Sequence, residues 1–105
     1  MNKEAIAEEN GMDIEDVEAM IVLFKQNAEA QRSKIKEAID AGGDEEIFIQ
    51  SFHKLAGSSA KLLGLGEINE IARQTELAIH NHTPYDPKKS LSAIEDILRK
   101  ENLIA

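Results

Sequence analysis

Four long stretches of the chain place apolar residues three and four positions apart, and no stretch alternates apolar with polar residues. This spacing puts the apolar side chains on one face of an α-helix, whereas a half-buried β-strand would repeat every second residue. The sequence therefore predicts an all-α fold. A short helical leader is expected over about residues 3–9, ahead of Gly11.

Capping residues and glycines mark the ends of the four predicted helices. Aspartate is a favoured N-cap, proline suits the first helical position, and glycine often follows the last turn. The expected helices run from Asp13 to Gly42-Gly43, from a cap at Asp44 to Gly64 or Gly66, from about residue 67 to 80, and from a cap at Asp86 with Pro87 at the first position.

The links between these helices are mostly short, which favours antiparallel packing of neighbours. The expected fold is an up-down-up-down antiparallel four-helix bundle in a single domain, residues 1–105, with a core of about residues 13–101. For the second helix, the inward-facing residues are predicted to be Phe48, Phe52, Leu55, Ser59 and Leu62.

Composition excludes several classes of function. The chain has no cysteine, which excludes disulfides, thiolate metal sites and cysteine nucleophiles. Its first residues lack the apolar core of a signal peptide, and no apolar run approaches membrane length, so we expect a soluble, cytoplasmic protein. The net charge of −8 argues against non-specific binding to nucleic acid, which needs a basic face.

The charge is distributed unevenly along the chain. Residues 47–66 carry only Lys54 and Lys61, a net charge of +2, while the segments on either side are net acidic. These lysines form a candidate basic patch for binding a phosphate group or a partner. The alternative is an ordinary core helix that happens to hold few charges.

Within this region, His53 and Gly57 are separated by about one helical turn. His53 follows Phe52 and is expected at the edge of the buried face. A glycine inside a helix costs about 1 kcal/mol relative to alanine, so its presence needs a reason. Helical side chains lean towards the N-terminus, and a larger residue at position 57 would cover His53. The glycine either leaves the imidazole open to a large partner group, or it lets two helices pack closely.

The segment FHKLAGSSAKLLGLGEINEIARQTELA resembles the phosphoacceptor helix and following helix of histidine-containing phosphotransfer domains. The family pattern is approximately His-x-Leu-Lys-Gly-Ser-(Ser/Ala), and its fold is a four-helix bundle. The resemblance implies that His53 is the phosphoacceptor and that Gly57 and Ser58 belong to the phosphate- or partner-binding surface. The positions in register are His53, Leu55, Gly57, Ser58 and Ser59.

Two positions depart from the family pattern. The family's lysine three residues after the histidine is Ala56 here, which leaves Lys54 and Lys61 as the nearby cations. The later family glycine falls at Gly64, eleven residues after His53 instead of ten. With that offset carried forward, Glu76 occupies the family position that contacts and orients the imidazole.

The resemblance also implies the chemistry and the partners. A neutral imidazole is a nitrogen nucleophile at cellular pH, and a carboxylate on one ring nitrogen would fix its tautomer. The chain would need no cofactor of its own, because a receiver-domain partner supplies an aspartate and Mg²⁺. The expected partners are response regulator receiver domains and a hybrid sensor histidine kinase. We expect a monomer with no kinase activity of its own and no nucleic-acid or membrane partner.

Other functions stay open at this stage. One alternative is the same bundle docking receiver or kinase domains without taking phosphate, which the missing lysine at Ala56 keeps open. A third class is a small helical structural or chaperone-like adaptor. Ser58 to Lys61 formally reads S-x-x-K, but the companion elements of that serine-nucleophile fold are missing. His80 and His82 are expected in a solvated loop, where histidines bind metals only adventitiously.

Overall fold

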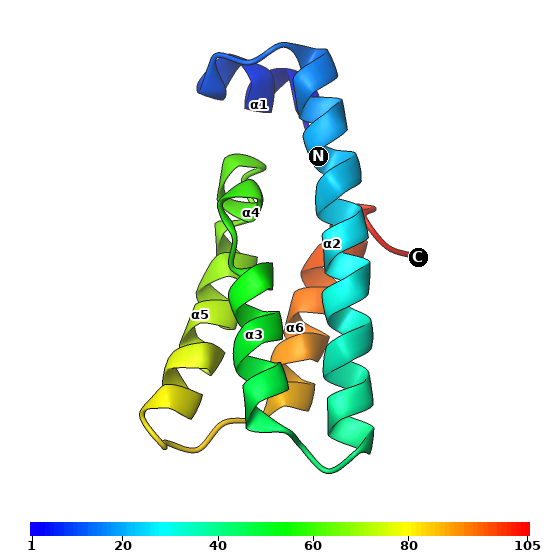
Figure 1. Ribbon diagram of the computed structural model, residues 1–105. Helices are drawn as coiled ribbons and strands as arrows, with labels where there is room; N and C mark the ends of the chain where they lie inside the picture. Colours follow the sequence, from blue (N-terminus) through cyan, green and yellow to red (C-terminus); the bar gives the residue numbers. More distant parts are fainter.

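The computed structural model describes residues 1–105, apart from the side chain of Ser58, and these residues form six helices and no strand (Figure 1). Helix accounts for 76% of the chain, which confirms the predicted all-α class. The helices are α1 (Lys3–Asn10), α2 (Ile14–Asp40), α3 (Glu45–Leu55), α4 (Ser58–Leu62), α5 (Gly66–His80) and α6 (Pro87–Lys100).

The helix starts lie where the capping residues predict them. The Asp44 side chain accepts hydrogen bonds from the backbone amides of Glu46 and Ile47, at 3.0 and 3.4 Å. The Asp86 side chain accepts one from the Lys89 amide at 3.0 Å, and Pro87 opens α6 as expected. Each cap satisfies amides that have no partner inside the helix, which fixes the start of α3 and of α6.

Four helices surround the apolar core. α3 packs against α2 and α5, and α6 packs against the same two helices, so these four close around a common interior (Figure 1). At 27 residues, α2 is about 40 Å long and spans nearly the full 43 Å of the molecule. No helix among the described residues is long and apolar enough to cross a membrane. The most deeply buried large side chains are Val17, Ile35, Phe48, Phe52, Leu55, Ile68, Ile94 and Leu98.

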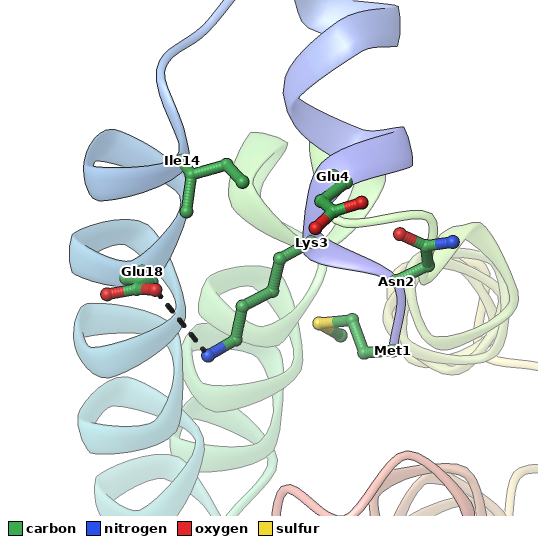
Figure 2. Close-up of a pocket in the computed structure, with 6 residues that line it drawn as sticks. All are labelled: Met1, Asn2, Lys3, Glu4, Ile14 and Glu18. Atoms are coloured by element: carbon green, nitrogen blue, oxygen red, sulfur yellow. Dashed lines mark ion pairs between the residues drawn. The ribbon is translucent and has the colours of Figure 1, made fainter.

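The leader α1 folds back beside the start of α2 (Figure 1). Gly11 makes this reversal with a left-handed φ of 62°, a conformation that glycine adopts without strain. A hollow of about 670 Å³ lies at this end. Figure 2 shows the ion pair beside it, in which Lys3 Nζ lies 4.0 Å from Glu18 Oε1. Ile6 and Ala7 of α1 are buried, so the leader belongs to the packed structure.

The structure differs from the prediction in the second predicted helix, which is divided into two shorter helices, α3 and α4. α3 ends at Leu55, and α4 begins at Ser58 after a turn at Ala56 and Gly57. Gly57 is the N-cap of α4, with extended φ and ψ of −75° and 167°, and is not inside a helix. The interruption shifts the buried face of the following residues: Leu63 is 3% exposed, whereas the predicted inward residue Leu62 is 43% exposed.

Two asparagines donate hydrogen bonds to the backbone at this interruption. Backbone carbonyls that a helix break releases need other donors. The Asn27 amide of α2 donates to the Lys54 carbonyl at 3.2 Å, and the Asn69 amide of α5 donates to the Ala56 carbonyl at 3.1 Å. Asn69 also lies 3.5 Å from the Gly57 carbonyl. The turn is therefore bonded to a helix on each side of it.

A half-buried ion cluster joins α2 to α6. Arg32 Nε donates to Glu95 Oε2 at 2.9 Å, and Lys36 Nζ lies 3.1 Å from the same oxygen. Burial alone would raise the pKa of Glu95, but the hydrogen bonds from Arg32 and Lys36 outweigh it and lower that pKa. The ionised carboxylate is thus more stable in the folded chain than in the unfolded chain.

We expect Glu95→Gln to lower the free energy of unfolding at pH 7 by about 1–3 kcal/mol, because two cations lose a charge-assisted partner. The wild-type advantage should be complete above the ordinary glutamate pKa and should be lost as the pH falls through the lowered folded-state pKa. Urea unfolding at several pH values measures both effects.

Asp96→Asn is the matched control, since Asp96 forms an exposed pair with Arg99 on the same helix at 3.2 Å. This variant should change the free energy of unfolding by less than about 0.5 kcal/mol. Equal losses in the two variants would show that the cluster on Glu95 contributes no more than a surface pair.

Candidate functional site

His53 lies in the last turn of α3 with 73% of its side chain exposed. Its neighbour Phe52 is fully buried in the core. Adjacent helical residues point about 100° apart, so the packing of Phe52 turns the imidazole to the surface. This agrees with the expected position of His53 at the edge of the buried face.

Glu76 of α5 contacts the imidazole from the neighbouring helix. Its two carboxylate oxygens lie 3.2 and 3.3 Å from His53 Nδ1, and its side chain is 18% exposed. An ionised carboxylate only accepts hydrogen bonds, so in this pair the proton of a neutral imidazole is on Nδ1. Nε2 then carries the lone pair, and no described side chain bonds to it. The structure brings Glu76 and His53 together, in the contact that the family resemblance implies.

His80 is a third member of this group that the sequence analysis assigned to the loop. It is the last residue of α5, and its Nε2 lies 3.8 Å from Glu76 Oε1. The four-residue spacing between Glu76 and His80 is the sequence signal for this contact, because such residues lie on one face of a helix. His82 lies beyond the helix in a left-handed backbone conformation, with φ of 54°.

The two predicted lysines line different hollows. Lys54 lines a hollow of about 200 Å³ on the α2 side of the turn, together with Asn27 and Gly57. Lys61 lines a hollow of about 430 Å³ on the α5 side, together with Asn69. The expected basic patch is therefore divided, and each lysine has its own surroundings.

Gly57 lies outside a helix interior, whereas its predicted clearance of His53 assumed a continuous helix. A Cβ atom built at Gly57 would meet one described atom within 4 Å, the Lys54 carbonyl oxygen at 3.4 Å, and no atom of His53. Because Gly57 caps α4 and lies outside a helix interior, the cost of a helical glycine relative to alanine does not apply at this position. The predicted phosphate- or partner-binding role of Ser58 concerns a side chain outside those that the structure describes.

Arg73 is a further cation that the sequence analysis did not single out. It projects from α5 one turn before Glu76, and it lines the same hollow as Lys61 and Ala56. Arg73 lies outside residues 47–66, which define the candidate basic patch, because it is distant from His53 in the sequence. Among the described residues, no three histidine, cysteine or carboxylate side chains are grouped to hold a metal ion.

We expect the Glu76 contact to decide the tautomer of His53. In the wild type at neutral pH, nitrogen-15 NMR of the ring should show the proton on Nδ1, and Glu76→Ala should shift it towards Nε2. Glu67→Ala, which removes a carboxylate from the first turn of the same helix, is the control and should leave the ring unchanged. An unaltered His53 spectrum in Glu76→Ala would show that the contact does not control the proton.

Comparison with known protein families, with curated proteins and with solved structures gives no match for this chain. The interpretation of the site therefore rests on its own geometry and on the short motif around His53. The geometry involves α3 and α5, and the motif lies in α3, the following turn and the start of α4.

Proposed function

We propose that this chain is a histidine-containing phosphotransfer protein in which His53 accepts a phosphoryl group from a receiver domain. The observation that carries the proposal is an exposed imidazole whose Nδ1 is held by Glu76, a residue 23 positions later on another helix. The proposed fold is the up-down-up-down bundle of α2, α3, α5 and α6, with α1 and α4 as additions at one end.

The chemistry follows from the state of the two ring nitrogens. The lone pair on Nε2 attacks the phosphorus of an aspartyl phosphate, the new N–P bond forms, and the P–O bond to the aspartate breaks. The aspartate leaves as a carboxylate, and the Nδ1 proton stays on the ring. Glu76 faces the positive charge that develops on the imidazole and stabilises it. The reverse step returns the group to an aspartate.

The partner supplies the remaining groups of the shared site. The aspartate and the Mg²⁺ that neutralises the phosphoryl charge belong to the receiver domain. We propose a monomeric, cytoplasmic protein without kinase activity, whose partners are response regulator receiver domains and a hybrid sensor histidine kinase. Lys54 is exposed directly after His53 and would meet the acidic surroundings of a receiver aspartate.

A second candidate function is an adaptor that docks receiver or kinase domains without taking phosphate. Ala56 favours this alternative, because the position that carries a lysine in the family presents no charge here. Its carbonyl is bound by Asn69, so the backbone at this position is also engaged. Uptake of phosphate by His53 separates the two functions.

The test is incubation with a panel of receiver domains labelled as aspartyl phosphates. Label should move to this chain from its cognate receivers, remain bound in alkali and be released in acid, as expected of an N–P bond. His53→Gln should keep the fold and lose all uptake, measured by gel autoradiography and circular dichroism. His82→Gln is the control and should retain the wild-type rate.

Two outcomes would contradict the proposal. Label retained in His53→Gln would place the acceptor elsewhere in the chain. Stable complexes with receiver domains, without any transfer of label, would support the adaptor instead.

A further inference from the structure

The hollow on the α5 side of the α3–α4 turn collects cations at the level of Ala56, three residues after His53. It has a volume of about 430 Å³. Two cations and one carboxylate face it, so its net charge is positive although the chain as a whole carries −8. Its lining residues are Ala56, Lys61, Gly66, Asn69, Glu70 and Arg73.

Two contacts place Arg73 relative to the imidazole. His53 contacts Glu76. The carbonyl of Ala56, three residues after His53 and just past the end of α3, accepts a hydrogen bond from Asn69, which lies seven residues before Glu76 on α5. The two helices therefore run in opposite directions at this contact. Arg73 lies three residues before Glu76 and four after Asn69, so it shares their face of α5 between the two levels. A group attached to His53 on the side of Ala56 would therefore face the stretch of α5 that carries Arg73.

Arg73 is also available for a ligand. The chain has three arginines, and both Arg32 and Arg99 form ion pairs with carboxylates. Arg73 is exposed and makes no ion pair or side-chain hydrogen bond with any described residue. A guanidinium presents several donors in a plane and binds phosphate oxygens in a bidentate manner, which a lysine cannot do.

We propose that Arg73, assisted by Lys61, binds the phosphoryl group carried on His53 Nε2. This inference rests on the proposed function. The small side chain of Ala56 leaves the hollow open, and the cation comes from α5 instead of from α3. Glu70 lines the same hollow and lowers its positive charge, so its removal should strengthen the interaction.

The test loads His53 directly with phosphoramidate, a small phosphoryl donor that needs no receiver domain. The phosphoryl signal of His53 is assigned in the phosphorus-31 NMR spectrum by its absence in His53→Gln. A neighbouring cation favours the doubly charged phosphoryl group, so Arg73→Ala should raise the phosphoryl pKa by about half a unit. Arg73→Lys should restore part of the difference, and Glu70→Gln should shift the phosphoryl pKa in the opposite direction from Arg73→Ala.

Arg99→Ala is the matched control, because it removes an exposed arginine from α6 and should leave the titration unchanged. A second readout is the equilibrium between phosphorylated receiver and phosphorylated His53, which Arg73→Ala should shift towards the receiver by about threefold. Identical titrations in wild type and Arg73→Ala, or an equal shift in Arg99→Ala, would overturn the role of Arg73. Failure of every receiver to transfer label would overturn the proposed function, while the directly loaded protein would still test Arg73.

Discussion

The burial of Phe52 between the long helices determines the arrangement of the site. Phe52 is fully buried, and α3 packs against both α2 and α5, so α3 cannot rotate without exposing an aromatic ring. His53 is consequently held at the surface beside α5. Glu76 reaches it from there because the same packing fixes the register of the two helices. A surface imidazole is thus positioned by a core residue.

The sequence predicts the starts of α3 and α6 well because they depend on local chemistry. Asp44 and the Asp86-Pro87 pair each cap a helix through amides within three residues, so a short segment contains the whole signal. The interruption at Ala56 and Gly57 was not predicted. Glycine and serine were compatible with a continuous helical period, and the donors that stabilise the break, Asn27 and Asn69, are distant in the sequence.

The candidate site also has a part that the sequence predicts and a part that it does not. His53 and its exposure follow from helical periodicity, whereas its contact with Glu76 was predicted only through the resemblance to a family. His80 lies where the predicted helix ends and the predicted loop begins, and its contact with Glu76 exists because the last turn of α5 is helical. Arg73 is not among the predicted site residues, because only the antiparallel contact of α3 with α5 places it on the face of α5 that contacts His53. Contacts between helices are set by the packing of the whole core, which no single segment specifies.

The side chain of Asn10 links the two short helices at one end of the molecule. Its amide donates to the carbonyl of Leu62, the last residue of α4, at 3.1 Å, while α4 joins α3 through only two residues. Neither helix is long enough to be stable by itself, so each depends on the other and on the core. They should form one cooperative unit that opens before the long helices do. Partial unfolding would then free α1 and α4 together, and the pairing of His53 with Glu76 between α3 and α5 would survive it.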